Sequence, residues 1–247
     1  MSYEDVRFHS GDGVGLHGWF LPASGKAAGT LVFLHGNAEN ISTHFAAVHW
    51  LPEHGFDVFI FDYRGFGLSE GAPHIKGAHQ DVTAALRYVR GRKDVDPDRL
   101  ILFGQSIGGA MALYAAATSG VPLRAVVSES AFASYPGIMR EKMSKVILTW
   151  PLQWMALGMT SKYDPIKVID NITVPLLLIH GDHDPIVPVQ HAHRLYASAQ
   201  GSKHFWVVDN GGHIDAFAPK RLAYRLRFTE FLRAVLRGKQ ETTTEWE

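Results

Sequence analysis

Short apolar segments alternate with segments of helical periodicity along most of the chain, and this alternation limits the fold more than any other feature. Each apolar segment has the length of one strand, and several end at glycine or at a polar residue. The expected strands cover 30–36, 56–65, 99–104, 123–130, 175–181 and 203–209. Strands that are apolar on both faces and separated by helices are typical of a parallel sheet with helices on both sides. We therefore expect an α/β fold with a mostly parallel central sheet.

The segments between these strands predict the helices. Expected helices cover 40–54, 76–92, the small-residue segment after Ser106, and 219–237. The last one is followed by a polar tail that we expect to be frayed. The first segment of the chain differs, because two alternating stretches flank Gly11-Asp12-Gly13. That pattern predicts a β-hairpin, which would add an antiparallel edge to the sheet.

Residues 132–165 are too many for an ordinary connection between two strands. We expect them to form a short helical cap over the end of the sheet, inserted into one domain that spans residues 1–247. A chain of 247 residues is long enough to bury a large core. The cap offers an apolar wall to a substrate, although packing against the sheet is the better explanation for most of its residues. The residues in question are Met143, Ile147, Leu148, Trp150, Trp154, Met155 and Met159.

Composition excludes several classes of function. The chain has no cysteine, which excludes disulfides, thiolate catalysis and Cys-ligated zinc. Its formal net charge is +0 and no basic stripe is visible, so nothing indicates nucleic acid binding. The N-terminal segment lacks the apolar core of a signal peptide. The longest apolar stretch, 146–159, is short for a membrane-spanning helix and is interrupted by Pro151 and Gln153. We expect a cytoplasmic protein without stable membrane insertion.

The strand at 99–104 leads directly into Gly104-Gln105-Ser106-Ile107-Gly108, and a helix follows at once. A G-x-S-x-G pattern between a strand and a helix is typical of a strained turn that lifts a serine hydroxyl above a sheet. Gly104 and Gly108 lack Cβ atoms, so the strand and the helix can pass closely. A plain glycine-rich turn would have the same pattern, but a phosphate loop is disfavoured because no Lys-Ser/Thr follows.

A serine nucleophile needs a base, and the base needs an acid that orients it. Downstream of Ser106, polar loops follow two of the expected strands, and they contain Asp182 with Asp184 and then His213. This gives the chain order serine, acid, histidine. The carboxyl ends of parallel strands meet at one edge of a sheet, so both loops should approach Ser106.

Taken together, these motifs resemble the α/β-hydrolase family. The resemblance is strongest to the branch with a prolyl-oligopeptidase-like catalytic domain and to the small acyl esterases and thioesterases. It covers residues from about 10 to 237 and implies a Ser-His-Asp hydrolase with Ser106 as nucleophile and His213 as base. The matching stretches are LVFLHGNAEN (31–40), FDYRGFGLSEG (61–71), GQSIGG (104–109), HGDHDPIVP (180–188) and NGGHID (210–215).

Three carboxylates are candidates for the acid. The family pattern resembles H-G-x-x-D followed by V-P, which places the acid at Asp184. Asp182 comes one glycine after the strand, so we expect its side chain to bond amides of its own turn. Asp184 precedes Pro185, which favours an extended backbone and a longer reach toward His213. Glu129 is a third candidate, better explained as a structural hydrogen-bonding group under the cap.

An oxyanion hole requires two backbone amides. Ile107, directly after the nucleophile, should supply one. The resemblance places the second at Asn37, with His35-Gly36 shaping the loop. An ordinary strand-to-helix turn is the alternative explanation for that segment. In the 61–71 loop, we expect Arg64 together with Asp62 to hold the loop in place and not to contact substrate.

The loop around residue 180 also contains side chains that can bind metals. These are His180, Asp182, His183 and Asp184, with His191 and His193 following. Their spacing does not place two histidines on one helix face, as a zinc helix does. We expect neither a metal nor a cofactor.

The expected reaction is acyl transfer to water through an acyl-enzyme, on a small-molecule carboxylic ester or thioester. A peptidase or amidase is less favoured, because the chain has no room for the β-propeller that filters peptides in the oligopeptidases. Other chemistries of this fold, such as C–C bond hydrolysis or haloperoxidase activity, are alternatives. Haloalkane dehalogenases use an aspartate where this chain has Ser106. A non-catalytic binding protein on the same fold is the remaining alternative.

Overall fold

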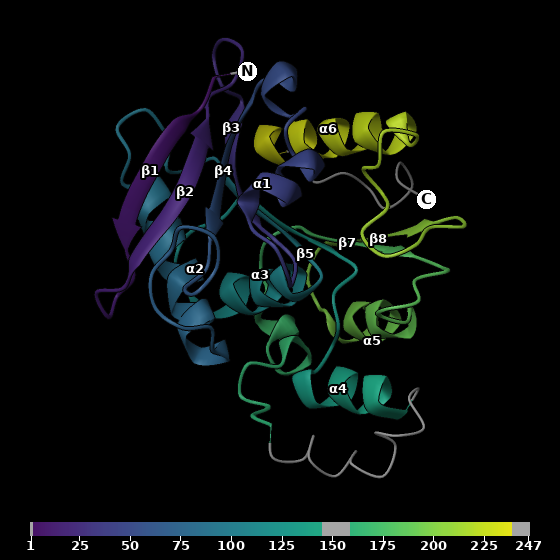
Figure 1. The fold of residues 1–247 in the computed structure, drawn as a ribbon. Coiled ribbons are helices and arrows are strands. Elements are labelled where there is room, and N and C mark those ends of the chain that lie inside the picture. Colours follow the sequence, from purple (N-terminus) through teal and green to yellow (C-terminus); the bar gives the residue numbers. More distant parts are fainter. Residues whose placement is uncertain (1, 145–158, 239–247) are drawn as a thin grey trace.

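The computed structural model describes residues 2–144 and 159–238. Within these residues, eight strands form one sheet in the order β1-β2-β4-β3-β5-β6-β7-β8 (Figure 1). The strands are β1 (Glu4–His9), β2 (Gly15–Leu21), β3 (Gly29–Leu34), β4 (Phe56–Asp62), β5 (Leu100–Gln105), β6 (Ala125–Glu129), β7 (Leu176–Gly181) and β8 (Lys203–Val208). Strands β3 to β8 pair in parallel, whereas β1 and β2 form a hairpin that pairs with β4 in antiparallel register. The predicted fold class is confirmed, including its antiparallel edge.

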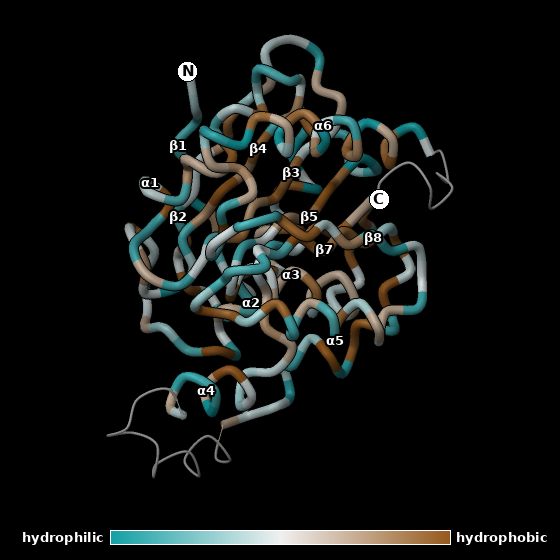
Figure 2. The backbone as a smooth tube through the Cα atoms, turned by 90° about the vertical axis from the view of Figure 1, so that its right-hand side faces the viewer, coloured by the Kyte–Doolittle hydropathy of each residue, from teal (hydrophilic) through white to brown (hydrophobic). Residues whose placement is uncertain are grey.

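The central strands are continuous apolar runs because helices cover both of their faces. Every residue of β3, β4, β5, β6 and β7 is buried. The edge strand β1 instead alternates between exposed and buried positions in its second half. Figure 2 shows the same distribution as hydropathy, with hydrophobic backbone along the central strands and hydrophilic segments toward the outside. A sheet of this kind presents its functional residues at strand ends and not on its faces.

Helices pack on both faces of the sheet (Figure 1). One face carries α2 (Ile75–Arg90), α3 (Ile107–Thr118) and α5 (Gln190–Ser198), and the other carries α1 (Ile41–His44) and α6 (Leu222–Arg237). The predicted helix over 40–54 is wrong in extent, because α1 is followed by two separate 3₁₀ helices, Phe45–Ala47 and Pro52–His54. Pro52 has no amide to donate, so it starts a new turn. Helix α5 was not predicted, because its nine residues are too few to show a clear helical period.

The segment predicted as a cap is described in part. It contains α4 (Tyr135–Ser144), which lies outside the layer of α3 and α5 (Figure 1). Tyr135 and Ile138 are buried, and the Tyr135 amide donates to Asp164 Oδ1 at 2.9 Å. The remaining apolar residues expected in the cap, Ile147, Leu148, Trp150, Trp154 and Met155, lie outside the described residues.

Candidate active site

Ser106 lies in a sharp turn between β5 and α3. Its backbone has φ 56° and ψ −118°, a left-handed conformation that is strained for a residue with a Cβ atom. A Cβ on Gly104 would meet the backbone of Gly108, and a Cβ on Gly108 would meet the carbonyl of Leu34. Glycine is therefore needed at both positions for the strand and helix to approach. The Ser106 side chain does not cap α3, so its hydroxyl is available to other groups.

The structure brings Ser106, His213 and Asp184 together from three separate loops. His213 Nδ1 lies 2.7 Å from Asp184 Oδ2, and His213 Nε2 lies 3.0 Å from Ser106 Oγ. A carboxylate only accepts hydrogen bonds, so Nδ1 carries the proton and donates to Asp184. Nε2 of the neutral ring is then an acceptor, and the Ser106 hydroxyl donates to it. This is the geometry that lets an imidazole remove a proton from a serine.

Asp184 is held as a carboxylate by its surroundings. Its side chain is buried, and its Oδ1 accepts from the amides of Ile186 at 2.8 Å and Val187 at 2.9 Å. Burial raises its pKa, but hydrogen bonds from His180, His213 and Val187 outweigh burial and hold the pKa below its ordinary value. The group can therefore stabilise positive charge on the His213 ring.

The other two acid candidates have different partners. Asp182 is exposed, and its Oδ1 accepts from His183 Nδ1 at 2.8 Å and from the Gly211 amide at 3.2 Å. It therefore bonds the loop that carries His213, and not only its own turn as expected. Glu129 is buried and accepts from Gln105 Nε2 at 2.7 Å and from the Ala216 amide at 2.9 Å. Burial raises the pKa of Glu129. Its position beneath the His213 loop is that of a structural support.

The His213 loop is strained on both sides of the histidine. Asn210 and Ile214 have φ values of 49° and 50°. For a β-branched residue such as Ile214, this conformation is unusual. Its amide donates to Ser130 Oγ at 3.2 Å, and Ser130 itself has φ 53°. Backbone strain of this kind clusters at functional sites, where it fixes the position of a side chain. No sequence pattern indicated that Ser130 or Gln105 supports this loop.

The two residues expected to form the oxyanion hole both line one cavity. Ile107 is the first residue of α3, and the first amides of a helix have no carbonyl partner within it. Asn37 lies in the loop after β3, where Ala38 and Glu39 have φ values of 82° and 58°. Both Asn37 and Ile107 line a cavity of about 220 Å³. Their function as oxyanion donors stays a prediction.

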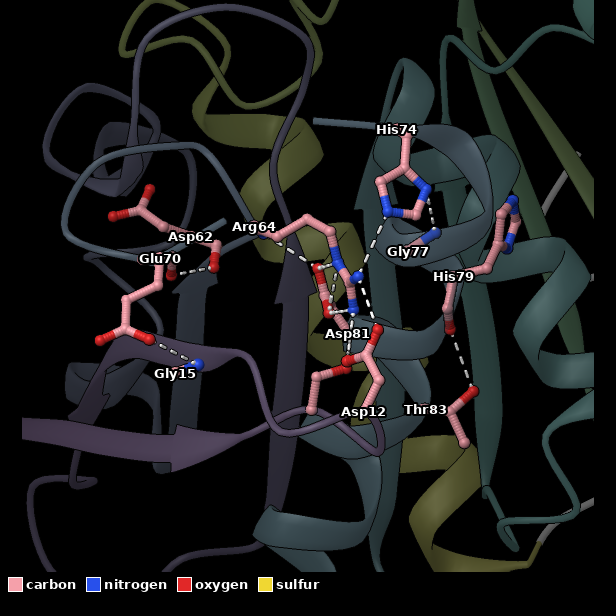
Figure 3. A network of polar contacts seen from close by, with 12 residues as sticks. Asp12, Gly15, Asp62, Arg64, Glu70, His74, Gly77, His79, Asp81 and Thr83 are labelled. Carbon is pink, nitrogen blue, oxygen red and sulfur yellow. Dashed lines mark hydrogen bonds and ion pairs between the residues drawn. The ribbon is translucent and has the colours of Figure 1, made fainter. Parts of the chain in front are cut away.

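Arg64 organises the loops around this cavity (Figure 3). Its buried guanidinium lies 2.7 Å from Asp81 and 2.8 Å from Asp12. The expectation that Arg64 and Asp62 hold this loop agrees with their contacts, although the two side chains have different partners. The Asp62 carboxylate accepts from the Leu68 amide of the same loop and from the Ile41 amide at 2.9 Å, at the end of the loop that carries Asn37. The carboxylates that bind Arg64 come from β1's turn and from α2, whose proximity the sequence does not reveal.

Two of the histidines near residue 180 form hydrogen bonds within the protein. His180 Nε2 donates to the Val187 carbonyl at 2.7 Å, and His191 Nε2 donates to Glu141 at 2.9 Å. Over residues 2–144 and 159–238, no three His, Cys, Asp or Glu side chains are grouped to hold a metal ion. In the same ranges, no helix has both the length and the apolarity needed to cross a membrane.

The sheet order and the helices on both faces define an α/β-hydrolase fold. The esterase Pf2001 of Pyrococcus furiosus superposes with a TM-score of 0.79 at 22% identity, over 95% of this chain and 93% of the esterase. The acylaminoacyl peptidase of Pyrococcus horikoshii superposes with a TM-score of 0.77 at 21% identity, over 98% of this chain and 42% of that one.

The chain belongs to the prolyl oligopeptidase family, whose family model matches residues 42–238. The uncharacterized protein YfhR of Escherichia coli (strain K12) is 40% identical over 242 residues, which are 95% of this chain and 82% of YfhR. Fold and family together make the protein a hydrolase of the α/β-hydrolase class.

Proposed function

We propose that this protein is a serine hydrolase that cleaves carboxylic ester or thioester bonds of small molecules through an acyl-enzyme. The observation that carries the proposal is the chain of contacts from Asp184 through His213 to Ser106, at 2.7 Å and 3.0 Å. In the proposed reaction, His213 Nε2 takes the proton of Ser106 as the serine oxygen attacks the carbonyl carbon. Asp184 stabilises the resulting imidazolium, and His213 then gives the proton to the leaving group. Water, activated by the same histidine, releases the acid.

The amides of Ile107 and Asn37 are the proposed donors to the negative oxygen of the tetrahedral intermediate. No group outside the chain is needed to balance this reaction, since water is the only second substrate. Amide cleavage is the second candidate, and family membership favours it, because the family model is that of the prolyl oligopeptidases. Comparison of p-nitrophenyl esters with the matching p-nitroanilides separates the two substrate classes.

A fluorophosphonate probe and short p-nitrophenyl esters test the proposal directly. We expect the wild-type protein to be labelled and to turn over the esters, and Ser106→Ala to lose both activities. Ser119→Ala, at the other end of α3, is the matched control and should retain them. A wild-type protein that neither reacts with the probe nor hydrolyses any ester would contradict the proposal.

A further inference from the structure

The cavity of about 220 Å³ beside Ser106 has a defined direction. Gly36, Asn37 and Ile107 line one end, and a Cβ on Gly36 would lie 3.7 Å from Ser106 Cβ. Met111 also lines the cavity and comes four residues after Ile107 on α3. Residues four apart lie on the same helix face, about 5 to 6 Å from each other. The cavity therefore extends from the serine along α3, and Ala78 of α2 is part of the same lining.

The position of the cavity indicates which half of an ester enters it. Its lining residues, all within the described part of the chain, include both expected oxyanion donors and the chain neighbour of Ser106, but none of Ser106, His213 and Asp184. In acyl transfer the histidine protonates the leaving group, so the alcohol or thiol must lie on the His213 side. The carbonyl carbon and its substituent then point to the opposite side, toward Met111.

Apart from Asn37, the polar side chains in the cavity wall are already hydrogen-bonded to other parts of the protein. The Tyr63 hydroxyl donates to the His35 carbonyl at 3.0 Å, and the Tyr135 hydroxyl lies 3.2 Å from His79 Nε2. Arg64 has five N–H groups, and its nitrogens are engaged by Asp81, Asp12, Ser10 and His74. Figure 3 shows the guanidinium together with Asp81, Asp12 and His74. A polar or charged chain end that points along α3, away from Asn37, would thus meet side chains that are already hydrogen-bonded, and a neutral chain is favoured.

We propose that this cavity is the acyl-binding pocket, that it takes an unbranched neutral acyl chain, and that Met111 and Ala78 set the chain length. This proposal rests on the proposed serine hydrolase function. A volume of about 220 Å³ holds roughly seven non-hydrogen atoms at about 30 Å³ each, the share of one molecule in liquid water. The preferred acyl group is therefore hexanoyl or octanoyl. The sequence directed attention to the cap for this wall, whereas α2, α3 and the 63–66 loop form most of it.

The test is the dependence of kcat/KM on acyl length, measured with p-nitrophenyl acetate, butanoate, hexanoate, octanoate, decanoate and dodecanoate. In the wild-type protein, each methylene that fits should raise kcat/KM about fourfold, with a fall after octanoate. Met111→Ala removes three non-hydrogen atoms and should move the optimum to chains about three carbons longer. Ala78→Leu adds three non-hydrogen atoms and should move the optimum acyl length to chains about three carbons shorter. Ala78→Val should shift the optimum in the same direction by less.

Two control variants separate the pocket from general effects on the helices. Leu113→Ala creates space in the core beside α3, and Ala84→Leu adds a side chain to α2, but neither residue lines this cavity. Both should retain the wild-type length profile. The alcohol half provides the second control, measured with acetate esters of ethanol, butanol, hexanol and octanol. The pocket variants should leave this series unchanged relative to the wild-type protein.

The outcomes distinguish this proposal from the function on which it rests. If the wild-type protein hydrolyses no ester, the serine hydrolase function is rejected. If it hydrolyses esters but neither pocket variant shifts the acyl profile, or the alcohol profile shifts instead, the acyl-pocket assignment is rejected while the hydrolase function stands. A preference for the p-nitrophenyl monoester of adipic acid over the hexanoate would also reject it, because an anionic chain end would then have a partner in the wall.

Discussion

The two aspartates of the loop after β7 are two positions apart, yet their surroundings differ. Asp184 is buried and accepts hydrogen bonds from His213 and from two amides. Asp182 faces solvent, bonds His183 and does not contact His213. The backbone turns at His183, which lies between them, so the Asp182 carboxylate points to solvent and the Asp184 carboxylate points into the protein. Position along the chain cannot separate two such residues, whereas their hydrogen-bond partners do.

We expect Asp184→Asn to lower kcat by about 10⁴-fold, because the amide no longer holds the His213 ring in the required tautomer. Asp182→Asn is the matched variant on the same loop and should cost less than about tenfold, since it loses one long hydrogen bond to the Gly211 amide. Steady-state kinetics on a p-nitrophenyl ester measures both. Small and equal losses in the two variants would move the role of the acid to Glu129.

At the scale of elements, the strands were predictable, whereas one helix was predicted with the wrong extent and α5 was not predicted. A strand buried on both faces needs a continuous apolar run, and such runs are visible without any knowledge of neighbours. The 40–54 segment is divided into α1 and two 3₁₀ helices, and α5 has only nine residues, so neither is long enough to show a clear helical period. Likewise, Ser106, His213 and Asp184 follow strand ends and could be named from the sequence. The residues of the cavity wall could not be named from the sequence, because they come from α2, α3 and a loop that only the fold brings together.

The turn from β5 to α3 depends on the absence of a side chain at Gly104. A Cβ there would meet the backbone of Gly108, and backbone atoms cannot move aside as a flexible side chain can. We expect Gly104→Ala to lower the free energy of unfolding by more than about 3 kcal/mol or to prevent folding, as severe overpacking does. Gly11→Ala, where a Cβ meets nothing within 4 Å, should change it by less than about 0.5 kcal/mol. Urea unfolding at pH 7 compares the two, and equal stabilities would contradict the steric account.

At the scale of the whole molecule, buried histidines link stability to pH. His35 and His79 are 0% and 6% exposed. Burial lowers the pKa of His35 to about 3 and that of His79 to about 4, from an ordinary value of 6.5. Between pH 7 and pH 5 the folded protein therefore keeps both rings neutral, while the unfolded chain binds a proton at each. The unfolded state is favoured as the pH falls, so each histidine should lower the free energy of unfolding by about 2 kcal/mol over this range.

His79→Phe tests this linkage, because Phe can keep the stacking against Tyr163 and has no group that titrates. The absolute stability of the variant should fall, since the Tyr135 hydroxyl loses its partner. Its loss of stability between pH 7 and pH 5, however, should be smaller than that of the wild-type protein by about 2 kcal/mol. Burial raises the pKa of Asp62 and of Glu129, so these two carboxyl groups favour the folded state as the pH falls. Both groups are present in the variant and in the wild-type protein, so their contribution cancels when the two proteins are compared. Tyr114→Phe, which removes a hydroxyl from a ring beside His79, should leave the pH dependence unchanged. If the His79→Phe protein loses as much stability as the wild type on acidification, His79 is protonated in the folded state, and its burial does not contribute to acid sensitivity.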